Sequence, residues 1–239
     1  MGKSLIIKGA NFSINGIVSE YTRLAWLGCS TRNSLDSGVT NGEYISSGVN
    51  MTEETRLVVE AIMDDSTHDV QLCGSRTSVP TQCQAWAKTN VVTFYFARKD
   101  ASTAMSMDVS TNIWDGKKHV FDISKGGIVL DGVPYYWSST PYVTEGQTSP
   151  LYLDCSSASS AGNYNSAAVS TSGGTRTPLN GVVKYVNIKI YSDYQDLTSL
   201  VVDAIPVKRK SDNVVCFYNT VNGEYLVRNN GSTPDYGTL

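Results

Sequence analysis

The segment after the Asp131-Gly132 turn concentrates aromatic side chains that could bind a sugar. Tyr135, Tyr136 and Trp137 follow the turn directly, and further rings and amides come in polar segments downstream. Large rigid rings give contact area at low entropic cost, and amides can hydrogen-bond to sugar hydroxyls. The sequence therefore predicts a carbohydrate-binding site at Tyr136, Trp137, Tyr142, Asn163 and Tyr164. The alternative is that the rings of this segment, Trp137 and Tyr135 above all, face the core of a strand.

Catalytic chemistry finds little support in the residue types and their spacing. Retaining glycosidases need two carboxylates about 5 Å apart. Glu53 and Glu54 are adjacent, so on a strand they would point to opposite faces, and Glu60 stands alone between apolar residues. His119 is one of only two histidines and is interpreted as a packed or edge residue. No Gly-x-Ser-x-Gly elbow is present. The sequence predicts no catalytic residues and no enzyme.

The segment from Asp64 to Asp69 is the best candidate for a metal site. It places three carboxylates within six residues, which could supply oxygen ligands to calcium. Aspartates are also ordinary turn residues, and this is the favoured interpretation. A ligand set for zinc is absent. No cofactor is therefore predicted, and calcium stays an open alternative.

Composition excludes several classes of partner. The chain has 239 residues, 41% of them hydrophobic and 17% charged, with a net charge of -3. Without a basic excess a nucleic acid is not expected as a partner, and no apolar run approaches the ~20 residues of a membrane helix. The apolar run Leu5 to Ile7 is too short for a signal-peptide core, so we expect no export signal.

The five cysteines are expected to be reduced and mostly buried. Their number is odd and no Cys-x-x-Cys pair occurs; the residues are Cys29, Cys73, Cys83, Cys155 and Cys216. A bridge between Cys73 and Cys83 across a hairpin is the alternative. Reduced thiols fit synthesis in a reducing cytoplasm.

The elements that must position these residues are expected to be strands. Val92 to Ala97, Tyr185 to Tyr191 and Leu57 to Met63 alternate with a period of two, and no segment shows a sustained helical period. Further strands are predicted at Leu5 to Lys8, Glu43 to Ser47, Val70 to Gly74, His119 to Ser124, Leu151 to Cys155, Leu200 to Pro206, Val214 to Tyr218 and Tyr225 to Arg228.

Hairpin turns connect these strands, and two regions differ from the rest. Asp131-Gly132, Asn222-Gly223 and Asn41-Gly42 tolerate positive φ and close hairpins, which favours an antiparallel sandwich. Residues 1–20 are interpreted as an arm. The segment from Ser138 to Pro178 is interpreted as long loops, where binding usually resides. The basic cluster Lys208-Arg209-Lys210 is expected in a solvated loop after Pro206.

Three stretches resemble the concanavalin A-like (laminin-G-like) domains of gut Bacteroidetes and their phages. The first runs from Tyr21 to Met63 and includes Glu43-Tyr44-Ile45-Ser46-Ser47-Gly48. The second, Lys117 to Pro134, resembles the central hairpin of the family. The third, Ile188 to Leu226, resembles its closing strands, with Asp203-Ala204-Ile205-Pro206 and Tyr218-Asn219-Thr220-Val221-Asn222-Gly223 in order.

The resemblance implies an all-β jelly-roll of two curved antiparallel sheets, with residues 1–20 as an arm and residues 21–239 as the sandwich domain. Glucanases of this fold carry Glu-x-Asp-x-Glu on one strand face, and no acidic residues here have that spacing. The start of the arm, Lys3 to Ala10, resembles the start of phage structural proteins.

We therefore expect a non-enzymatic, lectin-like structural protein on a virion surface, as a phage fibre or capsid decoration. Its expected partners are a glycan or cell-surface polysaccharide and, through the arm, other virion proteins. A homo-oligomer is an open alternative. Neither a nucleic acid nor a membrane is expected as a partner. The alternatives are a bacterial carbohydrate-binding module or adhesin, at the cell surface or secreted, an architectural subunit without sugar affinity, and an enzyme on the same fold.

Overall fold

The computed structural model describes residues 19–28, 45–63, 70–76, 81–88, 91–96, 105–138, 150–153, 183–228 and 234–239. Within these ranges all regular structure is β-strand. The segment from Asp64 to Asp69 and the arm up to residue 18 lie outside the described residues, as do Asn41-Gly42, Tyr142, Asn163 and Tyr164.

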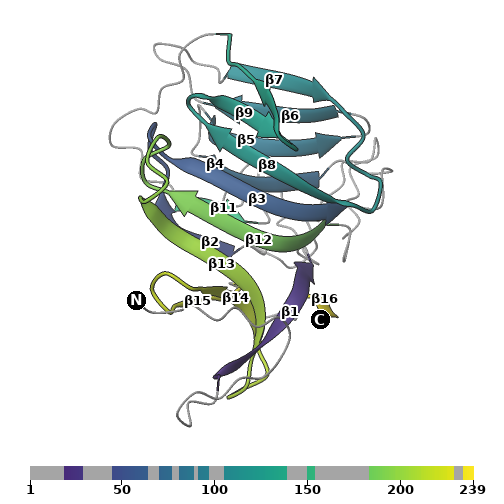
Figure 1. The fold of residues 1–239 in the computed structure, drawn as a ribbon, viewed down its shortest axis with the longest axis vertical. Helices are drawn as coiled ribbons and strands as arrows, with labels where there is room; N and C mark the ends of the chain where they lie inside the picture. Colours follow the sequence, from purple (N-terminus) through teal and green to yellow (C-terminus); the bar gives the residue numbers. More distant parts are fainter. Residues whose placement is uncertain are drawn as a thin grey trace, which may run out of the picture.

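The strands form two antiparallel sheets, which Figure 1 shows as two layers. The ten-stranded sheet has the order β10-β9-β8-β3-β12-β1-β13-β14-β15, with β16 paired to β1. Its strands are β1 (Tyr21–Gly28), β3 (Arg56–Met63), β8 (Lys118–Ser124), β9 (Gly127–Leu130), β10 (Val133–Tyr135), β12 (Val183–Tyr191), β13 (Leu200–Arg209), β14 (Val215–Asn219), β15 (Tyr225–Leu226) and β16 (Tyr236–Thr238).

The six-stranded sheet has the order β2-β11-β4-β5-β6-β7. Its strands are β2 (Ile45–Asn50), β4 (Val70–Arg76), β5 (Thr81–Lys88), β6 (Val91–Phe96), β7 (Met105–Ser110) and β11 (Pro150–Leu153). The chain crosses between the sheets several times, so neighbours in space are distant in sequence. The predicted all-β antiparallel sandwich is confirmed.

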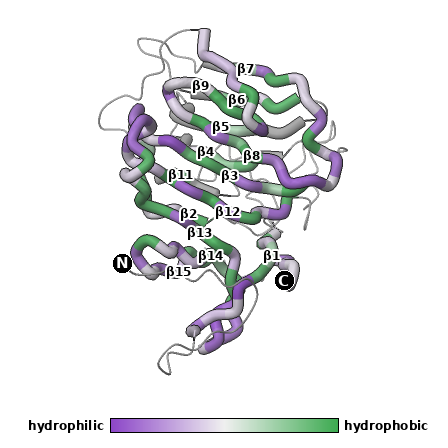
Figure 2. The backbone as a smooth tube through the Cα atoms, in the orientation of Figure 1, coloured by the Kyte–Doolittle hydropathy of each residue, from purple (hydrophilic) through white to green (hydrophobic). Residues whose placement is uncertain are grey.

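The core lies between the two sheets and follows from the alternation along their strands. In β3, Leu57, Val59, Ala61 and Met63 are buried and the residues between them are partly exposed. Phe94 of the six-stranded sheet and Phe121 of the ten-stranded sheet are fully buried in the same cluster. Each such ring contributes roughly 1.5–3 kcal/mol by leaving water. In Figure 2 the hydrophobic green stretches recur along strands of both sheets.

Two hairpins join β8, β9 and β10 into a meander at one edge of the ten-stranded sheet. Asp131 and Gly132 both have positive φ, 51° and 83°, and form the predicted turn between β9 and β10. Lys125-Gly126 closes the turn between β8 and β9. Gly127 follows with φ of 141°, and a Cβ there would overlap the Tyr135 carbonyl oxygen. Only glycine fits this position, because its backbone conformation and its free space both exclude a side chain.

Several sequence expectations differ from the structure in detail. Strands β5 and β7 were not among the predicted strands, because their apolar residues are interrupted by polar ones. Strand β13 runs on to Arg209, so Lys208 and Arg209 lie in a strand and not in a loop; Arg209 pairs with Asp212. Cys73 lies opposite Ala85 and not Cys83 in the β4–β5 register, and it is a buried thiol.

Candidate functional site

A small pocket opens on the outer face of the ten-stranded sheet, at the β8–β9 hairpin. Its volume is about 200 Å³. This is below the ~300–1,000 Å³ of sites for drug-sized ligands, so it suits one small unit of a larger molecule. We call it the tyrosine pocket; it is lined by Arg56, Asp122, Ser124, Gly126, Gly127, Ile128, Val129, Pro134, Tyr135, Tyr136 and Tyr194.

The period of two along the strands directs the polar lining outward. Because Leu57 of β3 and Phe121 of β8 point into the core, their neighbours Arg56 and Asp122 point to the opposite face. The β3–β8 register pairs Val58 with Asp122, which brings the two charged side chains together diagonally across neighbouring strands.

Arg56 and Asp122 form a bidentate ion pair at the floor of the pocket. Arg56 Nε donates to Asp122 Oδ1 at 2.9 Å, and Arg56 Nη2 donates to Asp122 Oδ2 at 2.6 Å. The side chains are 25% and 15% exposed. The hydrogen bond to Asp122 raises the pKa of Arg56, against an opposing effect of burial. The guanidinium carbon also lies 5.4 Å from the ring centroid of Tyr191. This cation–π contact favours the observed position of the guanidinium.

Three tyrosines line the pocket; Tyr135 also packs against the hydrophobic core, and the other two differ in exposure. Tyr136, which directly follows β10, is 76% exposed, whereas tyrosine side chains in folded proteins are usually partly buried. Tyr194 is partly buried, and a Cβ on Gly126 would lie 3.1 Å from its Cε2 atom. Glycine at position 126 therefore lets the ring of Tyr194 lie close to the hairpin.

Lys125 fixes the turn beside Tyr194. Its Nζ lies 5.2 Å from the Tyr194 ring centroid, forms an ion pair with Glu54, and approaches Glu53 Oε1 at 4.0 Å. The hydrogen bond to Glu54 raises the pKa of Lys125. Glu53 and Glu54 lie in a turn before β3 and not on a strand, so both carboxylates reach the same lysine, contrary to the sequence expectation of opposite faces.

The predicted site residues separate in the structure. Tyr136 lines the pocket, whereas Trp137 packs against the hydrophobic core, and its indole N–H donates to the Ser124 carbonyl at 2.8 Å. Trp137 therefore anchors the segment that presents Tyr136. The other three predicted residues lie outside the described part of the chain, as noted above.

Sequence reasoning missed Arg56, Asp122 and Tyr194. Arg56 and Asp122 are 66 positions apart, and only the β3–β8 register brings them together. The alternation of β3 and β8 could have placed both on an outer face, but it could not have paired them. Tyr194 follows β12 in a connection that carries no pattern pointing to this hairpin.

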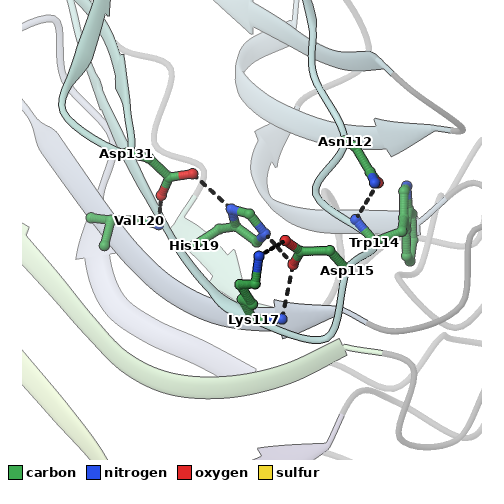
Figure 3. Close-up of polar contacts among 7 residues, drawn as sticks. All are labelled: Asn112, Trp114, Asp115, Lys117, His119, Val120 and Asp131. Atoms are coloured by element: carbon green, nitrogen blue, oxygen red, sulfur yellow. Dashed lines mark hydrogen bonds and ion pairs between the residues drawn. The ribbon is translucent and has the colours of Figure 1, made fainter.

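A second polar cluster lies at the other end of β8, where His119 sits between two carboxylates (Figure 3). Its Nδ1 lies 2.7 Å from Asp131 Oδ2, and its Nε2 lies 3.0 Å from Asp115 Oδ1. Both nitrogens can donate at once only when the ring is doubly protonated. His119 is 8% exposed, and Asp131 Oδ1 also accepts the Val120 N–H at 2.8 Å.

Asp115 is the most perturbed carboxylate of this cluster. The backbone N–H of Lys117 donates to it at 2.9 Å and is the first cause of a pKa lowered to about 2, followed by hydrogen bonds from the side chains of His119 and Lys117. These bonds join the loop before β8 to the β9–β10 turn. The cluster therefore holds the edge of the sheet together, as the packed interpretation of His119 expected.

The described ranges offer neither a cluster of metal ligands nor a membrane-spanning helix. These ranges contain no group of three or more His, Cys, Asp or Glu side chains that could hold a metal ion. The described residues also form no helix that is long and apolar enough to cross a membrane.

Comparison with solved structures finds similar folds at very low sequence identity. A candidate carbohydrate-binding protein from Bacteroides ovatus ATCC 8483 matches with a TM-score of 0.50 and 9% identity, over 90% of this chain and 62% of that one. The LG4-5 domains of the mouse laminin alpha1 chain match with a TM-score of 0.43 and 12% identity, over 89% and 52%. Alginate lyase A1-II′, of polysaccharide lyase family-7, matches with a TM-score of 0.39 and 12% identity, over 65% of this chain and 72% of that one.

These likenesses concern the fold alone. The chain spans 62% of the length of the Bacteroides ovatus protein. No family model and no curated protein matches the sequence.

Proposed function

We propose that this chain, a concanavalin A-like β-sandwich, is a non-catalytic glycan-binding protein and that the tyrosine pocket holds one sugar unit. The observation that carries the proposal is the exposed ring of Tyr136, 76% accessible, beside the Arg56–Asp122 ion pair. A sugar needs both an aromatic face and a hydrogen-bonding pair, and the pocket places them together.

The chemistry of the pocket matches the two surfaces of a sugar ring. The C–H face of a pyranose can stack on the ring of Tyr136, as apolar surface does on aromatic rings. Its hydroxyls can accept from Arg56 Nη1, which lies outside the bidentate pair, and can donate to the remaining lone pairs of Asp122. Gly126 and Gly127 contribute only backbone to the lining, and the ring of Tyr194 lies close to Gly126.

A binding role is favoured over catalysis because of the carboxylates in the pocket. Glycosidases use two carboxyl groups, about 5–9.5 Å apart, of which one must give or take a proton. Among the described lining residues, Asp122 is the sole carboxylate, and a guanidinium holds both of its oxygens. Among these described residues the second carboxylate that either glycosidase geometry requires is therefore missing.

The first test is a glycan array with the purified chain, followed by calorimetry on the glycans that bind. Tyr136→Ala should weaken binding roughly tenfold, in line with the contribution of one stacked ring, while leaving the fold intact. Tyr236→Ala is the matched control, since Tyr236 is an exposed tyrosine on β16, outside the pocket. A blank array from folded protein, with and without calcium, would contradict the proposal and favour a purely architectural role.

We extend the proposal to location, with the chain on a virion surface and residues 1–20 holding it to the particle. The support is the resemblance of Lys3 to Ala10 to the start of phage structural proteins. Gold-labelled antibody on purified particles should decorate their surface, and a chain without residues 1–20 should not assemble. Recovery of the chain only from an exported bacterial fraction would contradict this location and support a bacterial adhesin.

A further inference from the structure

We infer that the tyrosine pocket selects neutral sugars and rejects sugars that carry a carboxylate. This inference rests on the proposed glycan-binding function and names the ligand class of the same site. It comes from how the charged side chains of the pocket pair with one another: among the described residues, Arg56 in the lining and Lys125 beside it each have an acidic partner.

The arginine of the pocket is already occupied. Proteins recognise a carboxylate most specifically with the fork of a guanidinium, through two parallel N–H···O bonds. In Arg56 the Nε and Nη2 atoms of that fork both donate to Asp122. An acidic sugar would be left with the Nη1 side of a guanidinium whose positive charge Asp122 already balances, or would have to displace Asp122, which is only 15% exposed.

The lysine beside the pocket is balanced by more than one acid. Lys125 pairs with Glu54 and lies within 4.0 Å of Glu53. Arg56 and Lys125 therefore lie against three carboxylates, and Lys189 lies on the same face of the sheet, opposite Val58 and in register with Asp203. The connection carrying Tyr194, residues 192–199, contains Asp193 and Asp196 and no basic residue. The charged side chains around the pocket are thus balanced, so an anion gains no net attraction there and a neutral sugar needs none.

The hydroxyl groups of a neutral sugar, in contrast to a carboxylate, find both a donor and an acceptor in the pocket. Arg56 Nη1 remains as a donor outside the pair, and each oxygen of Asp122 keeps acceptor capacity. A donor and an acceptor held side by side match two neighbouring hydroxyls of a neutral hexose. The ring of Tyr136 then covers the C–H face of the same unit.

The test compares sugars that differ only at C6. Tetrasaccharides of glucose, galactose and mannose are titrated against the full chain, each beside its uronate counterpart with a carboxylate at C6. We expect at least one neutral tetrasaccharide to bind roughly tenfold or more tightly than its uronate, and no uronate to bind more tightly than its neutral partner.

Asp122→Asn sharpens the test because it frees the guanidinium fork. The variant should gain roughly tenfold in affinity for the uronates, and added salt should weaken this gained binding. Glu60→Gln is the control, since it changes the net charge of the chain equally. Glu60 lies on the same sheet, paired with Lys118 and outside the pocket lining, so its loss should leave the preference unchanged.

Failure of this inference is distinct from failure of the proposed function. If the wild-type chain binds a uronate as tightly as its neutral partner or more tightly, and Tyr136→Ala weakens that binding, the selectivity is overturned and glycan binding stands. If none of the six tetrasaccharides binds and the glycan array is blank, both proposals fall. The wild-type comparison decides the matter even if Asp122→Asn does not fold.

Discussion

The two ends of strand β8 carry similar polar side chains that have different roles. At the start of the strand, His119 is 8% exposed and lies between Asp115 and Asp131. At its end, Asp122 and Arg56 pair on the outer face, beside a ring that is 76% exposed. Each end joins a basic group to a carboxylate from another part of the chain, and the tyrosine pocket lies at the Asp122 end.

This contrast indicates that the hydrogen-bond pairing and the burial of polar side chains together distinguish a structural cluster from a binding site. Around His119 both ring nitrogens face carboxylate oxygens at the sheet edge, so little hydrogen-bonding capacity remains for a ligand. Around Arg56 the charges are paired, but Nη1 takes no part in the pair and Tyr136 beside it is 76% exposed. Polar groups with residual capacity at the surface are the ones that can bind.

The largest expected effect comes from the hairpin that both ends share. Gly127→Ala should destabilise the chain by about 3 kcal/mol, because the φ of 141° is strained for alanine and its Cβ overlaps the Tyr135 carbonyl. Urea unfolding measures the loss. Gly132→Ala is the control for φ alone, since nothing lies within 4 Å of its Cβ; it should cost only about 1 kcal/mol. Equal losses would show that the overlap does not matter.

The next effect tests the structural end. His119→Ala should cost about 2 kcal/mol of unfolding free energy, because Asp115 and Asp131 would lose their shared partner. Thermal and urea unfolding measure it, and glycan binding should not change. Lys117→Ala, at a side chain 79% exposed, should cost less than about 1 kcal/mol. A loss of glycan binding on His119→Ala with unchanged stability would reverse the roles assigned to the two ends.

A smaller effect should be visible in acid. The pKa of Asp115 is lowered from 3.8 to about 2, first by the Lys117 backbone N–H. A folded-state pKa below the unfolded value gives stability that is present above about pH 4 and is lost as the pH falls through about 2. Asp115→Asn should therefore flatten the decline of stability over this interval, measured by urea unfolding at successive pH values. An unchanged slope would show that another carboxylate controls it.

The smallest effect on stability belongs to the binding end. Tyr136→Ala should change the unfolding free energy by no more than about 0.5 kcal/mol, because the ring buries little surface in the fold. Differential scanning calorimetry checks it. A loss of several kcal/mol would mean that Tyr136 supports the hairpin and is not held ready for a ligand.

Much of the fold could be predicted because it depends on local patterns. The alternation of Leu57 to Met63 predicts a strand with one buried face, and β3 has that face. Asp131-Gly132 predicts a hairpin because both residues tolerate positive φ, and both adopt it. Strands β5 and β7 escaped prediction because polar residues break their apolar pattern, and their pairing in the six-stranded sheet decides their conformation.

Local patterns suffice for the strand class, the turns and the presence of aromatic residues after Asp131-Gly132, since each depends on residues within a few positions of one another. Only the tertiary structure decided that Tyr136 faces solvent while Trp137 faces the core, and that Arg56 meets Asp122 from 66 positions away. The physical reason is register: a slip of one residue between β3 and β8 would turn either side chain to the other face, and no local pattern encodes that choice.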